Sequence, residues 1–316
     1  MRKPNFFIVG APKCGTTSLY SYLRTHPAVF LSERKEPNFF CDDYADDFRR
    51  YKTQKAYLEG CFGRADESHQ VVGEGSVLYL SSGRALERIR DFNPRARILI
   101  AVREPVEMLK SLHNHLLYWT WEDERDLWDA WCLQEERREG KRIPANCPEP
   151  ALLQYRHFCS LGTQVERAHD IFPGEQILTI SLAELAESPL ETYKRVLGFL
   201  GLQFDGRRDF PPVNEAKSPK YAFLSKLLMP LSRIGRYSDF WNRLKEGLGI
   251  SGTGLISLLR AWNTSYGKQN RGLRPEHERA LREAFEEERA LLETYLDGSL
   301  RRTPTSESGD ESEVTG

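Results

Sequence analysis

Residues 5–27, NFFIVGAPKCGTTSLYSYLRTHP, decide the fold. The apolar run over residues 6–9 has the composition of a short buried strand and ends at Gly10. Residues 17–24 have helical composition, with apolar side chains spaced to cover one face. The stretch therefore predicts a strand, a tight loop and a helix in direct succession.

The chemistry of this predicted loop favours binding of an anion. Unpaired N–H groups at a helix start and the positive end of the helix dipole attract negative charge. In the nucleoside-triphosphate loop, G-x-x-x-x-G-K-[ST], the glycines and the hydroxyl residue correspond to Gly10, Gly15 and Thr17. Thr16 stands at the lysine position, and the lysine is Lys13, inside the loop, where its charge can still reach a phosphate.

A second departure from that pattern lies at residues 97–103, RILIAVR, which read as a buried strand. In ATP-hydrolysing enzymes of this architecture, the strand that supports magnesium ends in aspartate. This strand ends in Arg103, whose planar guanidinium suits a phosphate and not a metal. Ser111 follows about two helical turns later. The sequence therefore predicts a site for two anionic groups and no metal.

The alternation of elements predicts an α/β fold. Further strands are expected at about 29–32, 70–74 and 176–180, and helices at 83–92, from 105, at 152–172, at 188–200 and at 274–296. Strands that alternate with helices across short loops favour a central parallel sheet flanked by helices. We expect a single domain over residues 1–300.

Together these residues resemble the sulfotransferases that use 3′-phosphoadenosine 5′-phosphosulfate (PAPS), over residues 5–205 and more weakly to about 298. The resemblance implies a P-loop-like fold of three layers, PAPS as donor, its bisphosphate PAP as product, and no metal. Arg103 and Ser111 are similar to the family's 3′-phosphate motif. The residues similar to its 5′-phosphosulfate loop are Lys13, Cys14, Gly15, Thr16, Thr17 and Ser18.

The resemblance also implies candidates for the proton acceptor. Residues 35–40, KEPNFF, are similar to the segment that carries the catalytic glutamate in the carbohydrate, heparan-sulfate-type branch and its bacterial relatives. Glu36 is thus the candidate general base. The competing candidate is His115, which lies on the helical face of Ser111 and matches a histidine used in one part of that branch. In that case Glu36 would orient the acceptor or pair with Lys35.

One segment departs from that branch. Residues 74–80, EGSVLYL, resemble a stretch that begins Glu-Lys-Ser in the branch, but Gly75 replaces the lysine. Whatever that lysine does must be absent here or supplied elsewhere.

The implied activity is sulfuryl transfer to a hydroxyl, with an amine as the alternative, of a carbohydrate, glycolipid or small molecule. Lys13 and the loop N–H groups would stabilise charge on the bridging oxygen, and Glu36 would accept the proton. Two other functions stay open. A P-loop small-molecule kinase would need an aspartate for magnesium and a lysine after Gly15, and a non-catalytic module would bind nucleotide only.

Several residues have two readings. Cys14 is either a thiol activated by the helix start or a small residue that the loop tolerates. Residues 118–150 suggest an insertion on the acceptor side, with a charged helix followed by a loop. Its tryptophans are either packing residues or a wall for an acceptor: Trp119, Trp121, Trp128 and Trp131.

Composition narrows the class of protein. The chain has 316 residues, 40% hydrophobic and 29% charged, with a net charge of −1 that gives no overall attraction to nucleic acid. No run of 18 apolar residues occurs, and six cysteines show no zinc spacing. These patterns predict a cytoplasmic enzyme.

The composition changes in the last third of the chain, where residues from about 217 to 262 form a basic amphipathic stretch. It is expected either to pack on the domain with a solvated basic face or to lie on a membrane surface or an anionic glycan. The resemblance implies that this part closes over the adenosine and 3′-phosphate, with Lys217 and Tyr221 as donor contacts. Residues 301–316 have the composition of disorder.

Overall fold

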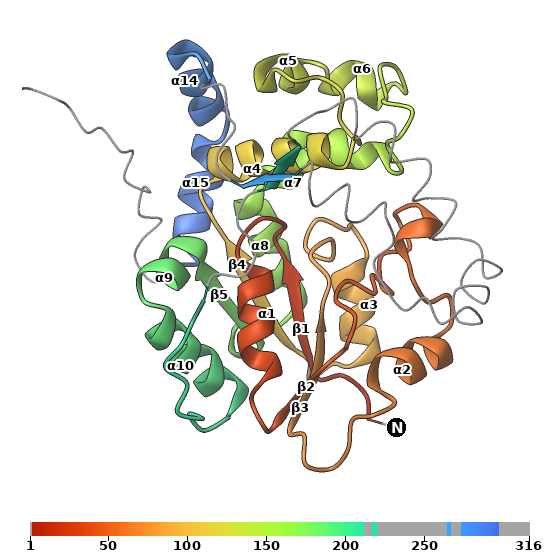
Figure 1. Ribbon diagram of the computed structural model, residues 1–316, viewed down its shortest axis with the longest axis vertical. Helices are drawn as coiled ribbons and strands as arrows, with labels where there is room; N and C mark the ends of the chain where they lie inside the picture. Colours follow the sequence, from red (N-terminus) through yellow and green to blue (C-terminus); the bar gives the residue numbers. More distant parts are fainter. Residues whose placement is uncertain (1, 212–216, 220–263, 267–272, 297–316) are drawn as a thin grey trace, which may run out of the picture.

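A parallel sheet of five strands, in the order β2-β3-β1-β4-β5, forms the centre of the protein (Figure 1). The computed structural model describes residues 2–211, 217–219, 264–266 and 273–296. All residues of β1 and β3 are buried, as expected for strands covered by helices on both faces. The strands are β1 (Phe6–Gly10), β2 (Val29–Leu31), β3 (Val71–Gly75), β4 (Arg97–Val102) and β5 (Ile177–Ser181).

The connections create a switch point between β1 and β4. From β1 the chain runs through α1 (Thr16–Arg24) to β2 at one edge, whereas from β4 it runs to β5 at the other edge. Right-handed crossovers in opposite directions place their helices on opposite faces. Figure 1 shows α1 in front of the sheet and α8 (Leu161–Ile171) behind it. Ligands of open α/β sheets bind outside the carboxyl ends of strands at such a point.

The remaining helices cover the sheet and the end of the sheet where the predicted loop lies (Figure 1). Helix α3 packs against α8, and α10 packs against β5. The α-helices are α2 (Gln54–Phe62), α3 (Ala85–Phe92), α4 (Pro105–Tyr118), α5 (Leu127–Cys132), α6 (Gln134–Arg138), α7 (Tyr155–Cys159), α9 (Leu182–Glu187), α10 (Pro189–Leu200), α14 (Pro275–Ala284) and α15 (Glu286–Glu293). Short 3-10 turns are η1 (Asp46–Phe48), η2 (Pro150–Leu153) and η3 (Gly174–Gln176).

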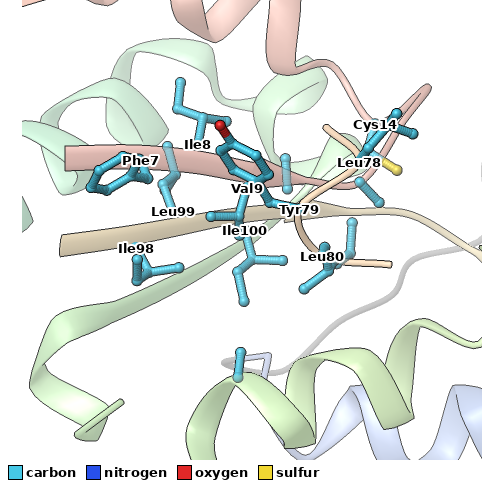
Figure 2. Packing of buried hydrophobic residues seen from close by; sticks show 14 of the residues in the cluster. Phe7, Ile8, Val9, Cys14, Leu78, Tyr79, Leu80, Ile98, Leu99 and Ile100 are labelled. Carbon is cyan, nitrogen blue, oxygen red and sulfur yellow. The ribbon is translucent and has the colours of Figure 1, made fainter. Parts of the chain in front are cut away.

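The core lies between the central strands and the turn that follows β3. Figure 2 shows apolar side chains of β1 and β4 beside those of residues 78–80, with Cys14 at the end of the cluster. The turn is tied to β1, because Leu80 N donates to Val9 O at 2.8 Å and Ser76 N to Ile8 O at 3.0 Å. Burial of these strands and of this turn fixes the base of the loop after β1.

The prediction of a single helix over residues 152–172 is wrong. This stretch is divided into η2, α7 and α8, with non-helical backbone at Gln154 and Ser160. The Glu288 carboxylate of α15 accepts from Thr163 N and Thr163 Oγ1, at 2.9 and 2.7 Å, and so caps the start of α8. Gln164 Nε2 donates to His157 O at 2.6 Å. These contacts come from tertiary packing, which the local sequence does not encode.

The helix expected over residues 274–296 is likewise two helices. Phe285, between α14 and α15, has φ −112° and ψ 10°, and its side chain is buried. Its ring lies edge-on to Trp131 with centroids 5.4 Å apart. Packing of this aromatic pair accompanies the break between the two helices.

The insertion over residues 118–150 holds two short helices, α5 and α6, in place of one charged helix. Asp126 caps α5, accepting from Trp128 N at 2.8 Å. Glu122 and Arg137 form a fully buried ion pair with two hydrogen bonds of 2.6 and 2.7 Å, and Tyr155 OH also donates to Glu122 at 2.6 Å. The hydrogen bond from Tyr155 connects this ion pair, and with it the insertion, to α7.

Removal of one partner of this ion pair is expected to destabilise the fold. In Arg137→Met, the carboxylate of Glu122 stays buried without its cation, which costs about 3–5 kcal/mol of the free energy of unfolding. Urea denaturation measures the loss. Arg138→Met, at the exposed neighbouring position, is the matched control and should change the free energy of unfolding by about 0.5 kcal/mol or less. Equal effects of both substitutions would contradict this account of the insertion.

Most of the basic stretch predicted at 217–262 lies outside the described residues, as do Tyr221 and the tail 301–316. Within it, β6 (Lys217–Pro219) pairs antiparallel with β7 (Thr264–Tyr266) and lies beside α4 (Figure 1). In the part of the chain that the structure describes, none of the helices has the length and apolar character needed to span a bilayer.

Candidate active site

The loop after β1 reaches the start of α1 through a left-handed turn. Gly15, the N-cap of α1, has φ +83°, which glycine adopts without strain. A Cβ there would lie 2.7 Å from Leu182 Cδ1, so the position has neither the conformation nor the space for a side chain. The strand, loop and helix predicted from the sequence are present, and the first N–H groups of α1 lie beyond the carboxyl end of β1, at the switch point of the sheet.

Cys14 does not have the environment of a reactive thiol. Its side chain is fully buried, and Sγ donates to Pro12 O at 3.4 Å. Burial raises the pKa of the thiol to about 12, although the charges of Arg103 and Lys13 act in the opposite direction. The alternative in which the helix start activates this thiol is wrong, because desolvation outweighs the effect of the cations.

Lys13 and Arg103 are brought together from two loops. Arg103 directly follows β4, and its Nη1 donates to Lys13 O at 3.3 Å. Lys13 itself has φ +66°. Burial lowers the pKa of Lys13, the charge of Arg103 lowers it further, and Lys35 acts in the same direction. Mutually repelling cations at one place imply a site that binds negative charge.

Lys35 is a residue of this site that the sequence reasoning missed. Its Nζ donates to Thr16 Oγ1 at 3.2 Å and to Thr17 Oγ1 at 3.3 Å. It also contacts Glu36 Oε1 at 3.2 Å, and its side chain is mostly buried. Lys35 therefore places a third cation directly on the threonines that begin α1. The sequence could have suggested this role, because Lys35 directly precedes Glu36, the candidate base.

Glu36 lies at the same place but faces solvent. Its side chain is 44% exposed, and its backbone N–H donates to Gly75 O at 2.9 Å. Its negative charge raises the pKa of Lys13, which shows that the two groups are close enough to interact. An exposed carboxylate beside a cluster of cations has access both to a bound anion and to a second substrate.

His115, on α4, is close enough to Lys13 for the lysine charge to affect its pKa. Burial and the charge of Lys13 lower the pKa of His115 to about 3, so the imidazole is neutral at pH 7. Ser111 is half-buried one turn earlier on α4. Lys217 belongs to β6, beside α4. The structure thus gathers Lys13, Arg103, Glu36 and His115, while the donor contact expected of Tyr221 falls outside the described residues.

The position of Gly75 has little room for the lysine that the resembling branch carries. A Cβ at Gly75 would lie 3.0 Å from Tyr20 Cδ2, and the Tyr20 hydroxyl is hydrogen-bonded to Ser32. A side chain here would have to displace a buried, hydrogen-bonded ring. Lys35 approaches the loop from the segment that follows the neighbouring strand β2.

The fold and this site define a class: a P-loop-like α/β protein with a cationic site at its strand-to-helix loop. Residues 3–217 match the family described as the sulfotransferase domain. The chain belongs to that family.

Similar proteins agree with this assignment. Carbohydrate sulfotransferase 15 of Mus musculus is 29% identical over 256 residues, covering 63% of this chain and 44% of that protein. Bifunctional heparan sulfate N-deacetylase/N-sulfotransferase 2 of Bos taurus is 25% identical over 205 residues, covering 64% and 22%. The chain thus spans less than half the length of these relatives. A crystal structure of a sulfotransferase from Alicyclobacillus acidocaldarius has a TM-score of 0.59 and 28% identity, covering 77% of this chain and all of that one.

Proposed function

We propose that this sulfotransferase transfers a sulfuryl group from PAPS to a carbohydrate hydroxyl, with Glu36 as general base. The observation that carries the proposal is the cluster of Lys13, Lys35 and Arg103 around the start of α1, with the Glu36 carboxylate at its solvent side. This set of hydrogen-bond donors fits a ligand with two anionic groups, because three cations from three segments gather at the helix N–H groups.

Each residue has a defined task in this scheme. The helix N–H groups and Lys35 would bind the 5′-phosphosulfate end, and Arg103 the 3′-phosphate, with Ser111 and Lys217 alongside. Lys13 would stabilise the negative charge that develops on the bridging oxygen as the sulfur–oxygen bond breaks. Glu36 would take the proton of the acceptor hydroxyl as its oxygen attacks sulfur from the opposite side.

Accessibility favours Glu36 over His115 as the base. The Glu36 side chain is 44% exposed beside the loop cations, where an acceptor hydroxyl can reach it. His115 is largely enclosed, with its ring edge-on to Trp119 at 6.3 Å between centroids. We assign His115 to positioning of Lys13, whose charge acts on the imidazole.

The acceptor class rests on the relatives. Two of them carry carbohydrate or heparan sulfate in their names. In this chain, Trp119 and Trp121 stack with centroids 5.9 Å apart, and Phe48 lies edge-on to Trp121. Trp119 follows α4, the helix that carries His115. Aromatic faces of this kind suit the apolar face of a sugar ring, so we propose them as part of the acceptor wall.

Binding of the bisphosphate product tests the donor assignment. PAP should bind in the presence of EDTA, and Arg103→Ala should weaken binding by about 2–3 kcal/mol, roughly 30–150-fold, through loss of a charge-assisted hydrogen-bonding fork. Titration calorimetry measures both. Arg95→Ala, an exposed position before β4, is the matched control and should leave affinity unchanged. Binding that required magnesium, or unweakened binding by Arg103→Ala, would refute the donor assignment.

A further inference from the structure

Glu74, near the end of β3, carries a buried carboxylate to which the proposed reaction assigns no task. Its side chain is fully buried. Tyr57 OH and Tyr79 OH donate to Oε1 at 3.0 and 2.6 Å, and Ser76 Oγ donates to Oε2 at 2.6 Å. Among the described residues, no cationic side chain pairs with it. Burial raises the pKa of Glu74 to about 7, although the three hydroxyl donors act to lower it. Burying a carboxylate that has only hydroxyl partners lowers the stability of the fold, so such a group is expected to have a structural or functional role.

The hydroxyl of Ser76 connects this carboxylate to the segment of Glu36. Ser76 Oγ accepts a hydrogen bond from Asn38 N at 3.1 Å while it donates to Glu74. The adjacent Gly75 O accepts from Glu36 N at 2.9 Å. The turn over residues 36–38 is therefore attached at both of its ends to consecutive residues of β3 and its extension.

This turn has a conformation that needs such attachment. Glu36 has φ +63° and Asn38 has φ +50°, and neither is a glycine. Left-handed backbone is unfavourable for a non-glycine residue and persists only where surrounding contacts hold it. Pro37, between them, has no backbone N–H, so the backbone donors of this turn are those of Glu36 and Asn38, and both bond to β3 or its extension.

The direction of the serine proton depends on Glu74. A serine hydroxyl has one proton, and once it is donated to the carboxylate the oxygen lone pairs are left for the N–H of Asn38. Tyr57 and Tyr79 occupy the other carboxylate oxygen, so Oε2 is left for Ser76.

We propose that Glu74 is a positioning residue that acts through Ser76 to hold the 36–38 turn, and thereby keeps the Glu36 carboxylate beside the cations of the loop. The inference rests on the proposed role of Glu36 as base. The signature of such a role is a loss of turnover with intact binding of PAP. Outside the turn, Arg103 donates to Lys13 O, and Lys35 donates to the hydroxyls of Thr16 and Thr17 in addition to its contact with Glu36.

The test compares Ser76→Ala with Tyr79→Phe. Ser76→Ala removes the link to Asn38. Tyr79→Phe removes a donor to Glu74 Oε1 of the same length, 2.6 Å, but leaves the link intact. Three quantities are measured for each: affinity for PAP by calorimetry, hydrogen exchange of the peptide over residues 33–41 by mass spectrometry, and turnover with PAPS and a pool of desulfated glycosaminoglycan oligosaccharides.

Ser76→Ala is expected to bind PAP within twofold of the wild-type protein, to exchange the 33–41 peptide faster, and to lose turnover about 10–100-fold. Tyr79→Phe is expected to keep both exchange and turnover within about threefold. Wild-type exchange in Ser76→Ala, or an equal loss of turnover in Tyr79→Phe, would overturn the proposal. Hydrogen exchange needs no acceptor. An absence of sulfuryl transfer by the wild-type protein would therefore refute the proposed function, while exchange still decided whether Ser76 holds the turn.

Discussion

Glu36→Gln is expected to reduce turnover by about 10²–10⁴-fold while leaving the affinity for PAP intact. The amide keeps the shape of the side chain and its contact with Lys35 but cannot accept the proton of the acceptor hydroxyl, and general-base catalysis contributes a factor of that size. Initial rates with saturating donor and acceptor give turnover, and calorimetry gives the affinity.

The controls for Glu36→Gln separate loss of basicity from loss of charge. Glu33→Gln, in the same loop and paired with Arg64, removes a negative charge without touching the loop cations and should keep wild-type turnover. His115→Ala should lose less turnover than Glu36→Gln. A Glu36→Gln enzyme of near-normal turnover beside an inactive His115→Ala enzyme would transfer the role of base to His115.

Lys13→Ala is expected to lose turnover by about 10²–10³-fold, and affinity for PAP by no more than about tenfold. The charge of Lys13 matters most in the transition state, because the bridging oxygen gains its negative charge only as the bond to sulfur breaks. Lys35 and Arg103 remain to bind the ground state. Single-turnover rates and calorimetry separate the two effects.

The matched control for Lys13→Ala is Lys55→Ala, a lysine on the surface of α2 whose side chain is 84% exposed. It should change neither quantity. Equal losses of turnover and of affinity in Lys13→Ala would make Lys13 an ordinary binding residue, contrary to the scheme.

The sequence predicts the sheet and its loop because the information is local. The strands contain continuous apolar runs, such as residues 6–9 and 98–102, and Gly15 marks the left-handed turn that begins α1. Errors occurred where distant residues decide the backbone. The break before α8 depends on the Glu288 cap, and that between α14 and α15 coincides with packing of Phe285 on Trp131. Neither partner is adjacent in sequence.

In the candidate site, too, the residues set by local sequence were predictable and those set by long-range contacts were not. Lys13 and Arg103 were predictable because each lies at the carboxyl end of one of two adjacent strands. Lys35 was missed because only the fold brings its amine to Thr16 and Thr17. The helix start at Cys14 suggested a reactive thiol, but the depth of burial, which no local pattern gives, raises its pKa. The hydrogen bonds that attach the 36–38 turn to Ser76 and Gly75 likewise join residues 38 and 39 positions apart in the sequence.

The most direct test of the central claim is transfer by the purified protein itself. Protein, PAPS and desulfated glycosaminoglycan oligosaccharides are incubated with EDTA, and the oligosaccharides are examined by mass spectrometry. The account predicts the gain of a single sulfuryl group per acceptor site, formation of an equal amount of PAP, and loss of both products in Lys13→Ala. Magnesium-dependent transfer of phosphate from ATP to the same oligosaccharides, with no sulfuryl gain from PAPS, would contradict it.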